Sequence, residues 1–167
     1  MPAYKIFQFD DKKIALIGVT TPETLNSSTP AYFQDDKGNF IYSFNEDATG
    51  KKLYTNIQNT VDTVQKLGVD YVFLVAHLGM NGITPRWSSL AVAQNTQGID
   101  AIIDGHSHEV IPSFIAKNKQ GKNVLITQTG TKLQNIGKLT ITPQGEISTE
   151  LINDLTKTNP KTTDLIN

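Results

Sequence analysis

The chain has 167 residues, of which 38% are hydrophobic and 19% charged; this is typical of one folded domain and argues against a disordered or membrane-embedded polypeptide. Its 15 Lys and Arg and 16 Asp and Glu leave a net charge of −1, so no DNA or RNA polymer is expected as a partner. The absence of cysteine excludes disulfides, thiolate metal sites and cysteine nucleophiles. No stretch approaches the ~20 apolar residues of a membrane span, and the start lacks the apolar core of a signal peptide.

The first fifty residues combine a hairpin with a long loop. Residues 4–9 and 13–19 are short β-rich runs around Asp10-Asp11-Lys12, which predicts a β-hairpin. Residues 25–52 are rich in Asn, Ser, Asp and Gly and have no sustained period. We therefore expect a surface loop there, with a short ribbon around residues 40–44.

Two helices and two buried strands are predicted next. The first helix has Thr55 as its cap and ends at Gly68, because apolar residues recur at helical spacing between them. The second begins with Thr84-Pro85 and runs to about Asn95. Each helix is followed by an apolar run without polar alternation, which predicts a strand buried on both faces. These strands cover residues 70–76 and 101–104.

The pattern changes after residue 108 to antiparallel strands, predicted at residues 110–116, 123–128, 136–141 and 146–152. Residues 153–167 are rich in Thr, Lys and Asn, which predicts a linker or tail. The fold class is therefore α/β, with a mixed sheet and two main helices.

All three histidines follow the two buried strands: His77 ends the first, and His106 and His108 follow the second. In open α/β sheets, ligands bind at the carboxyl ends of strands. Neutral imidazole is a common metal ligand, so the placement of all three residues favours a metal site over three separate turn or core histidines.

Five motifs in this order resemble a known family: Lys13 to Glu23, Ala76-His77-Leu78-Gly79, Ile102 to His108, Gln128-Thr-Gly130 and Asn135-Ile-Gly137. They resemble the second, carboxyl half of the catalytic domain of bacterial 5′-nucleotidases, which are calcineurin-like metallophosphoesterases. Relatives in this family act on 2′,3′-cyclic nucleotides and UDP-sugars. The resemblance covers residues 4–152, so residues 1–152 are expected to form part of a metallophosphoesterase domain.

The resemblance implies half of an α-β-β-α sandwich and a site for two divalent ions such as zinc or manganese. Positions matching His77 and His106 bind one ion, and the position matching His108 binds the other. Asp104 is a candidate for orienting a ligand histidine. The implied substrate of the intact protein is a nucleotide or related phosphate ester, and the implied location is secreted, periplasmic or at the cell surface.

The family also has an early Asp-x-His, a bridging Asp and a Gly-Asn-His motif with the catalytic histidine, and this chain contains none of them. No catalytic residue is therefore assigned here, the substrate-binding residues stay unknown, and the chain alone is expected to be inactive. The lack of the first half also predicts an uncovered sheet face that includes Val72, Leu74, Ile102 or their neighbours, and hence self-association.

Two other functions remain open. The chain could be a catalytically silent module that binds a metal or a protein on the same scaffold. An amidohydrolase-type metal enzyme is less consistent with the sequence, because 167 residues are too few for its barrel.

Overall fold

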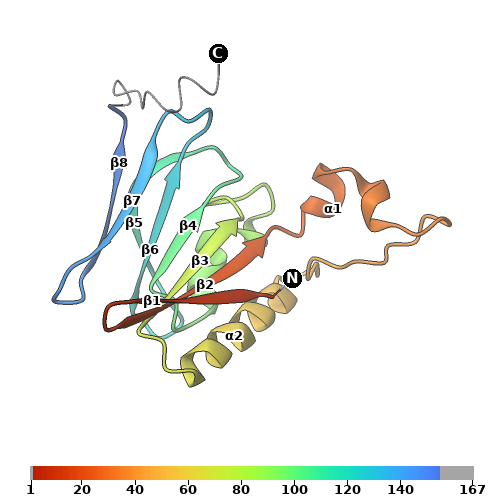
Figure 1. Ribbon diagram of the computed structural model, residues 1–167. Coiled ribbons are helices and arrows are strands. Elements are labelled where there is room, and N and C mark those ends of the chain that lie inside the picture. Colours follow the sequence, from red (N-terminus) through yellow and green to blue (C-terminus); the bar gives the residue numbers. More distant parts are fainter. Residues whose placement is uncertain (1, 155–167) are drawn as a thin grey trace, which may run out of the picture.

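The computed structural model describes residues 2–154, so residues 155–167 of the predicted tail lie outside the described part (Figure 1). The elements are β1 (Tyr4–Phe9), β2 (Lys12–Thr20), α1 (Thr24–Ser27), the 3-10 helix η1 (Pro30–Phe33), α2 (Lys51–Lys66), β3 (Tyr71–His77), the 3-10 helix η2 (Pro85–Trp87), α3 (Ser89–Asn95), β4 (Ala101–Asp104), β5 (Val110–Lys117), β6 (Asn123–Thr129), β7 (Ile136–Ile141) and β8 (Ile147–Ile152). In residues 2–154, no helix is long and apolar enough to cross a membrane.

Six strands form one mixed sheet in the order β1-β2-β3-β4-β6-β5. The inner strands β2, β3, β4 and β6 run parallel, and β1 and β5 pair antiparallel at the two edges. The predicted α/β class with a mixed sheet and two main helices, α2 and α3, is confirmed, and so is the β1–β2 hairpin. Because the inner strands are parallel, their carboxyl ends share one edge of the sheet.

The helices α2 and α3 cover one face of the sheet. Apolar residues of α2 at helical spacing, such as Leu53, Ile57 and Val61, pack on alternate residues of the strands. This main core is fully buried, and its strand side includes Val72 and Leu74. Alternation along each strand then directs the residues in between to the opposite face.

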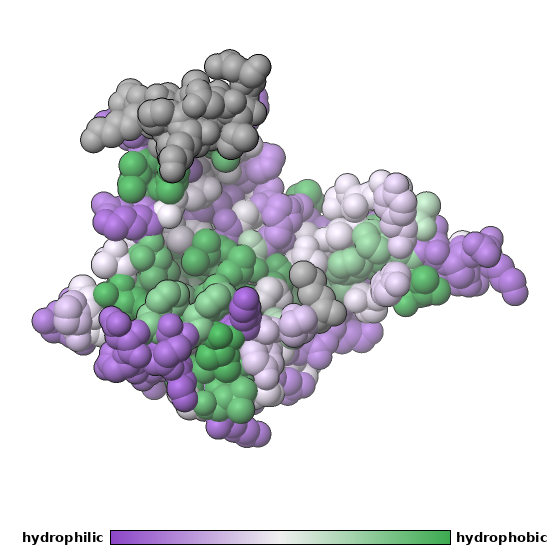
Figure 2. Space-filling view, in the orientation of Figure 1, coloured by the Kyte–Doolittle hydropathy of each residue, from purple (hydrophilic) through white to green (hydrophobic). Residues whose placement is uncertain are grey.

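A separate hairpin, β7–β8, covers only part of that opposite face. It packs over a second, smaller core around Phe73, Ala101 and Leu125. Beyond the hairpin, hydrophobic residues remain at the surface, as Figure 2 shows between β1 and β7–β8. They line an open groove of about 220 Å³ formed by Phe7, Phe9, Ile14, Leu16 and Phe73.

The predicted identity of the uncovered residues is wrong in part. Val72, Leu74 and Ile102 point to the helices and are at most 2% exposed. The exposed residues are their neighbours on the other face, among them Val75 at 47% and Phe9 at 59%. The one-residue difference matters because successive strand residues face opposite sides.

Both predicted helix starts are also wrong. Helix α2 begins at Lys51, before Thr55, because the carboxylate of Asp47 accepts the backbone N–H of Lys52 at 2.5 Å. Helix α3 begins at Ser89, and its cap is Ser88, whose hydroxyl accepts the backbone N–H of Ala91 at 3.1 Å. Pro85 starts only the short 3-10 turn η2. A nearby side-chain acceptor decided each start.

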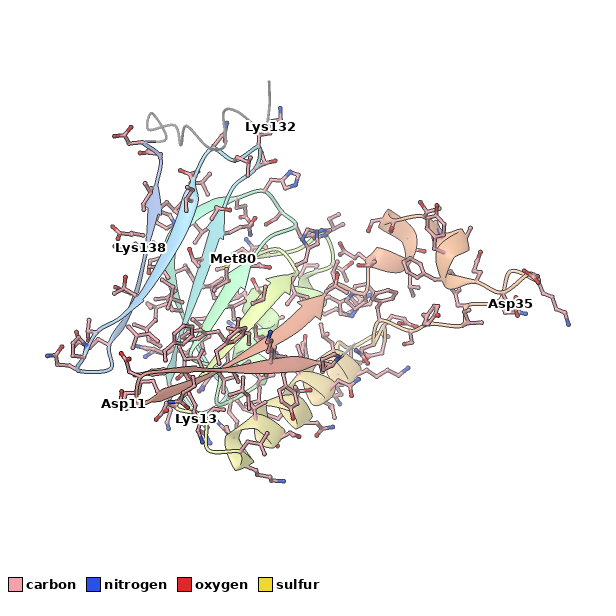
Figure 3. All side chains as sticks on the ribbon, in the orientation of Figure 1. Asp11, Lys13, Asp35, Met80, Lys132 and Lys138 are labelled. Atoms are coloured by element: carbon pink, nitrogen blue, oxygen red, sulfur yellow. The ribbon has the colours of Figure 1, made fainter. Side chains whose placement is uncertain are left out.

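The segment between β2 and α2 forms an arm that projects from the sheet (Figure 1). Asp35 marks its tip, far from Asp11 of the β1–β2 turn and Lys13 of β2 (Figure 3). The expected long loop is present, but it contains α1 and η1, and the expected ribbon is reduced to one bridge between Gln34 and Phe40. The arm leaves β2 at the same sheet edge where β3 and β4 end.

Candidate metal centre

The carboxyl ends of β2, β3 and β4 bring the candidate site together. In the parallel register, Thr20 of β2 lies opposite His77, the last residue of β3. Asp104 ends β4 and leads into the Gly-His-Ser-His turn. β3 and β4 form from short apolar runs whose residues are mostly buried, and the polar residues begin where these runs end.

Two of the three histidines meet at this edge. The ring centroids of His77 and His106 lie 5.0 Å apart, with their planes at 63°. Two nitrogens on one tetrahedral zinc, each 2.0–2.1 Å from it, would lie roughly 3.3 Å apart, which rings at this spacing can reach. The pair is thus close enough to share one ion.

The turn itself has a rare backbone conformation. His106 has φ of 81° and His108 has φ of 57°, both in the left-handed region that non-glycine residues seldom adopt. Such positions cost on the order of 1–3 kcal/mol and concentrate at functional sites. Gly105 precedes them, and a Cβ there would lie 3.2 Å from Nδ1 of His77, so the glycine leaves room for that ring.

His108 is exposed and makes no ring contact with the other two histidines within residues 2–154. It is nevertheless near enough to act electrostatically on His77. Loss of water around the ring lowers the pKa of His77, and the charge that His106 can carry lowers it further. Asp104 has an opposite effect on this pKa, and His108 adds the smallest lowering effect. A lower pKa keeps this imidazole neutral, which is the form that binds metal.

Asp104 is buried, and one of its oxygens holds the loop after β3. Oδ1 accepts the backbone N–H groups of Leu78 at 2.9 Å and Gly79 at 3.3 Å. Oδ2 is buried and has no hydrogen-bond partner within the described residues. Asp104 therefore contacts backbone rather than a histidine ring, and its suggested role in orienting a histidine stays a prediction.

Gln128 of β6 holds the Gly-His-Ser-His turn by hydrogen bonds. Its Oε1 accepts the backbone N–H of Glu109 at 2.9 Å, and its Nε2 donates to Oγ of Ser107 at 3.1 Å. The side chain is 1% exposed, so these bonds are shielded from water. Ser107 also accepts the N–H of Met80 at 3.3 Å, which links the turn to the loop after β3.

Glu23 is the site residue that sequence reasoning missed. It follows β2, and its Oε2 lies 2.8 Å from Nε2 of His106. Burial raises the pKa of Glu23, but the hydrogen bonds from His106 and Thr84 outweigh burial and hold the pKa below its usual value. The sequence signals for Glu23 were its position just after a strand, at Thr20-Thr21-Pro22-Glu23, and its place at the end of the motif Lys13 to Glu23.

Among residues 2–154, no group of three or more His, Cys, Asp or Glu side chains is arranged to hold a metal ion. Two imidazoles whose ring centroids lie 5.0 Å apart are still suited to a divalent cation. Asp104, whose Oδ2 has no hydrogen-bond partner within residues 2–154, acts electrostatically on His77. His77 and His106 are brought together, and His108 is not. The metal assignment of all three residues stays a prediction.

A hollow of about 520 Å³ lies on the helix side of β2, between that strand, α2 and residues 43–45. Thr20 and Asn45 are among its lining residues, and the three histidines are not. The substrate-binding residues are therefore not identified by this hollow.

Comparison with characterised proteins gives a consistent set of relatives. The chain is 31% identical to a 5′-nucleotidase of Vibrio vulnificus over 131 residues, which cover 70% of the chain and 21% of that protein. It is 30% identical to the NAD 5′-nucleotidase of Haemophilus influenzae over 106 residues, 63% of the chain and 14% of that protein. The trifunctional nucleotide phosphoesterase YfkN of Bacillus subtilis is 26% identical over 95% of the chain.

The relatives of this chain are 5′-nucleotidases of the metallophosphoesterase superfamily. The resemblance first seen in the histidine motifs is thereby confirmed, and the relatives are phosphoesterase-type hydrolases. No protein-family model matches the chain. The chain spans 10–21% of the length of these relatives, as expected for a partial piece.

Solved structures share the fold. The 5′-nucleotidase precursor of Thermus thermophilus has a TM-score of 0.67 at 22% identity, covering 90% of this chain and 29% of that one. The sulfate thiohydrolase SoxB of the same genus has a TM-score of 0.70 at 21% identity, covering 99% of this chain and 27% of that one. At such low sequence identities the similarity is evidence for a shared fold only.

Proposed function

We propose that this chain is the carboxyl half of a metal-dependent phosphoric ester hydrolase domain that acts on nucleotides. The observation that carries the proposal is the meeting of His77 and His106 at the carboxyl edge of the sheet, where their ring centroids lie 5.0 Å apart. The sequence relatives, all named as nucleotidases or nucleotide phosphoesterases, support it.

In this proposal His77 and His106 bind one divalent ion and His108 binds a second, supplied with further ligands by residues outside this chain. Zinc and manganese suit imidazole and oxygen ligands. When bound, a pair of such ions polarises the phosphoryl group and lowers the pKa of a bound water so that it can attack. Asp104 fixes the loop that follows His77, which holds that ring in place.

The chain supplies metal binding and orientation but no histidine for proton transfer. All three of its histidines are already assigned as ligands, so none is left as a general acid for the leaving oxygen. Proton donation of that kind contributes ~10²–10⁴-fold to rates. The isolated chain is accordingly inactive in this proposal, and the intact domain is the enzyme.

The substrate class is a nucleoside monophosphate or a 2′,3′-cyclic nucleotide, which is consistent with the names of the sequence relatives. The fold by itself does not select it, since the sulfate thiohydrolase SoxB has a similar fold. A secreted, periplasmic or surface location accords with the precursor form named for the Thermus nucleotidase.

The test is a hydrolysis assay on AMP and on 2′,3′-cyclic AMP with added zinc or manganese. We expect no turnover by the purified chain, and metal-dependent turnover when the amino-terminal half of a 5′-nucleotidase catalytic domain is joined ahead of it. His106→Ala in the joined protein should abolish that turnover, whereas Lys138→Ala, on the distant strand β7, should not. Turnover that survives His106→Ala would refute the proposed site. A joined protein that binds metal but remains inactive would favour a silent binding module.

A further inference from the structure

Glu23 connects three loops at the candidate metal centre. It stands in the loop after β2, its Oε1 accepts the backbone N–H of Thr84 from the loop after β3 at 2.7 Å, and its Oε2 contacts His106 in the turn after β4. The side chains of His106 and Glu23 are only 14% and 11% exposed. A charge-assisted hydrogen bond shielded in this way is stronger than one in water.

The contact also decides which ring nitrogen of His106 faces the site. A carboxylate can only accept, so the Nε2 atom at 2.8 Å must be the donor and must carry a proton. In a neutral imidazole the other nitrogen, Nδ1, then keeps its lone pair. No hydrogen bond to Nδ1 of His106 is found within residues 2–154, and the ring packs edge to face against His77.

We propose that Glu23 is a positioning residue that holds the His106 ring with Nε2 turned toward the carboxylate and Nδ1 presented to the metal ion. The inference rests on the proposed function for the identity of the ion, but the orientation of the ring is a property of the metal-free chain. Glu23 acts through His106 and does not itself bind the ion. Ligand histidines that donate their second nitrogen to a carboxylate gain a fixed tautomer and higher basicity.

The backbone of the turn explains why the His106 ring needs the contact with Glu23. His106 adopts φ of 81°, where a non-glycine residue is strained, so its side chain is not fixed by regular secondary structure. Its Nε2 bond joins it to a residue 83 positions earlier in the chain. Because the same carboxylate also binds Thr84, displacement of Glu23 would loosen two of the three loops.

The first test is nuclear magnetic resonance of the metal-free chain labelled with ¹⁵N. Long-range ¹H–¹⁵N correlation spectra, assigned with His77→Ala and His106→Ala, report which nitrogen of His106 carries the proton. We expect a protonated Nε2 whose proton exchanges slowly with water, and an unprotonated Nδ1. Glu23→Ala should make that proton exchange rapidly, whereas Glu23→Gln, which keeps an acceptor oxygen, should largely preserve it.

The matched control is Glu109→Ala, because Glu109 lies in the same turn but bonds Oγ of Ser107 at 2.5 Å and not a histidine. It should leave the His106 signals unchanged. A proton on Nδ1 in the wild type, or slow exchange that survives Glu23→Ala, would overturn the inference.

The second test is metal binding. Zinc affinity should fall about 10–100-fold in Glu23→Ala, the usual effect of losing such a partner, and should be unchanged in Glu109→Ala. With ¹¹³Cd in place of zinc, the coupling from the metal should appear at Nδ1 of His106. Equal zinc affinity in Glu23→Ala and wild type would refute the positioning role. A wild-type chain that holds its Nε2 proton but binds no zinc would instead refute the proposed function.

Discussion

Gly105 offers a sensitive test of the candidate metal centre. The Cβ of Gly105→Ala would lie 3.2 Å from Nδ1 and 3.8 Å from Cε1 of His77, against an ordinary contact distance of 3.4–4 Å. The His77 ring must therefore shift by a few tenths of an ångström. Disturbing the support of a metal ligand usually costs 10–100-fold in affinity, and we expect about tenfold here, or about 1.4 kcal/mol.

The free energy of unfolding of Gly105→Ala should rise although its zinc affinity falls. Gly105 is not in the left-handed region, so alanine is compatible with its backbone, and the stiffer unfolded chain contributes about 0.4–1 kcal/mol to stability. Gly18→Ala in β2 is the matched control, because its Cβ would meet nothing within 4 Å. Both variants should melt at or above the wild-type temperature, and only Gly105→Ala should bind zinc more weakly in calorimetry. Equal zinc affinity in the two variants would show that the space beside Gly105 does not matter for metal binding by His77.

Two further predictions concern stability and association. Burial raises the pKa of Asp100 above 3.8, so its protonated form favours the fold and stability is lost as the pH rises through the raised pKa. Asp100→Asn keeps an acceptor for the N–H of Val72 and should gain in melting temperature relative to wild type between pH 3 and pH 7; a difference that does not change with pH would contradict this. Because Val75 lies on the uncovered sheet face, the chain should self-associate at micromolar concentration by light scattering. Val75→Lys should weaken this and Leu133→Lys, 88% exposed on a loop, should not; a monomeric wild type would contradict it.

The sheet was predictable because its signals are local. The uninterrupted apolar runs that end at His77 and Asp104 appear as the parallel strands β3 and β4. The helix starts were not predictable to the residue. The acceptor for the first turn of α2 is Asp47, which lies outside the helix, and Thr55 is a residue of the helix interior.

The site was predictable only in part, because some of its contacts join residues that are far apart in the sequence. His77 ends β3 and His106 lies in the turn just after the neighbouring parallel strand β4, so the two were expected to lie close together, and they do. Glu23 could not be found in this way, because its contact with His106 spans 83 residues and depends on how the loop after β2 folds back. The contact between Gln128 of β6 and Ser107 of the turn likewise joins residues that are 21 positions apart in the sequence.

In the proposed site, His77 and His106 form the metal-binding pair of this chain. Calorimetric titration of the purified chain with zinc tests it most directly, with wild type, His77→Ala, His106→Ala, His108→Ala and the variant lacking all three histidines. We expect weak binding of one ion by the wild type and by His108→Ala, and none by either of the other single variants. Equal binding by the wild type and the variant without histidines would show that the histidines are not the metal ligands.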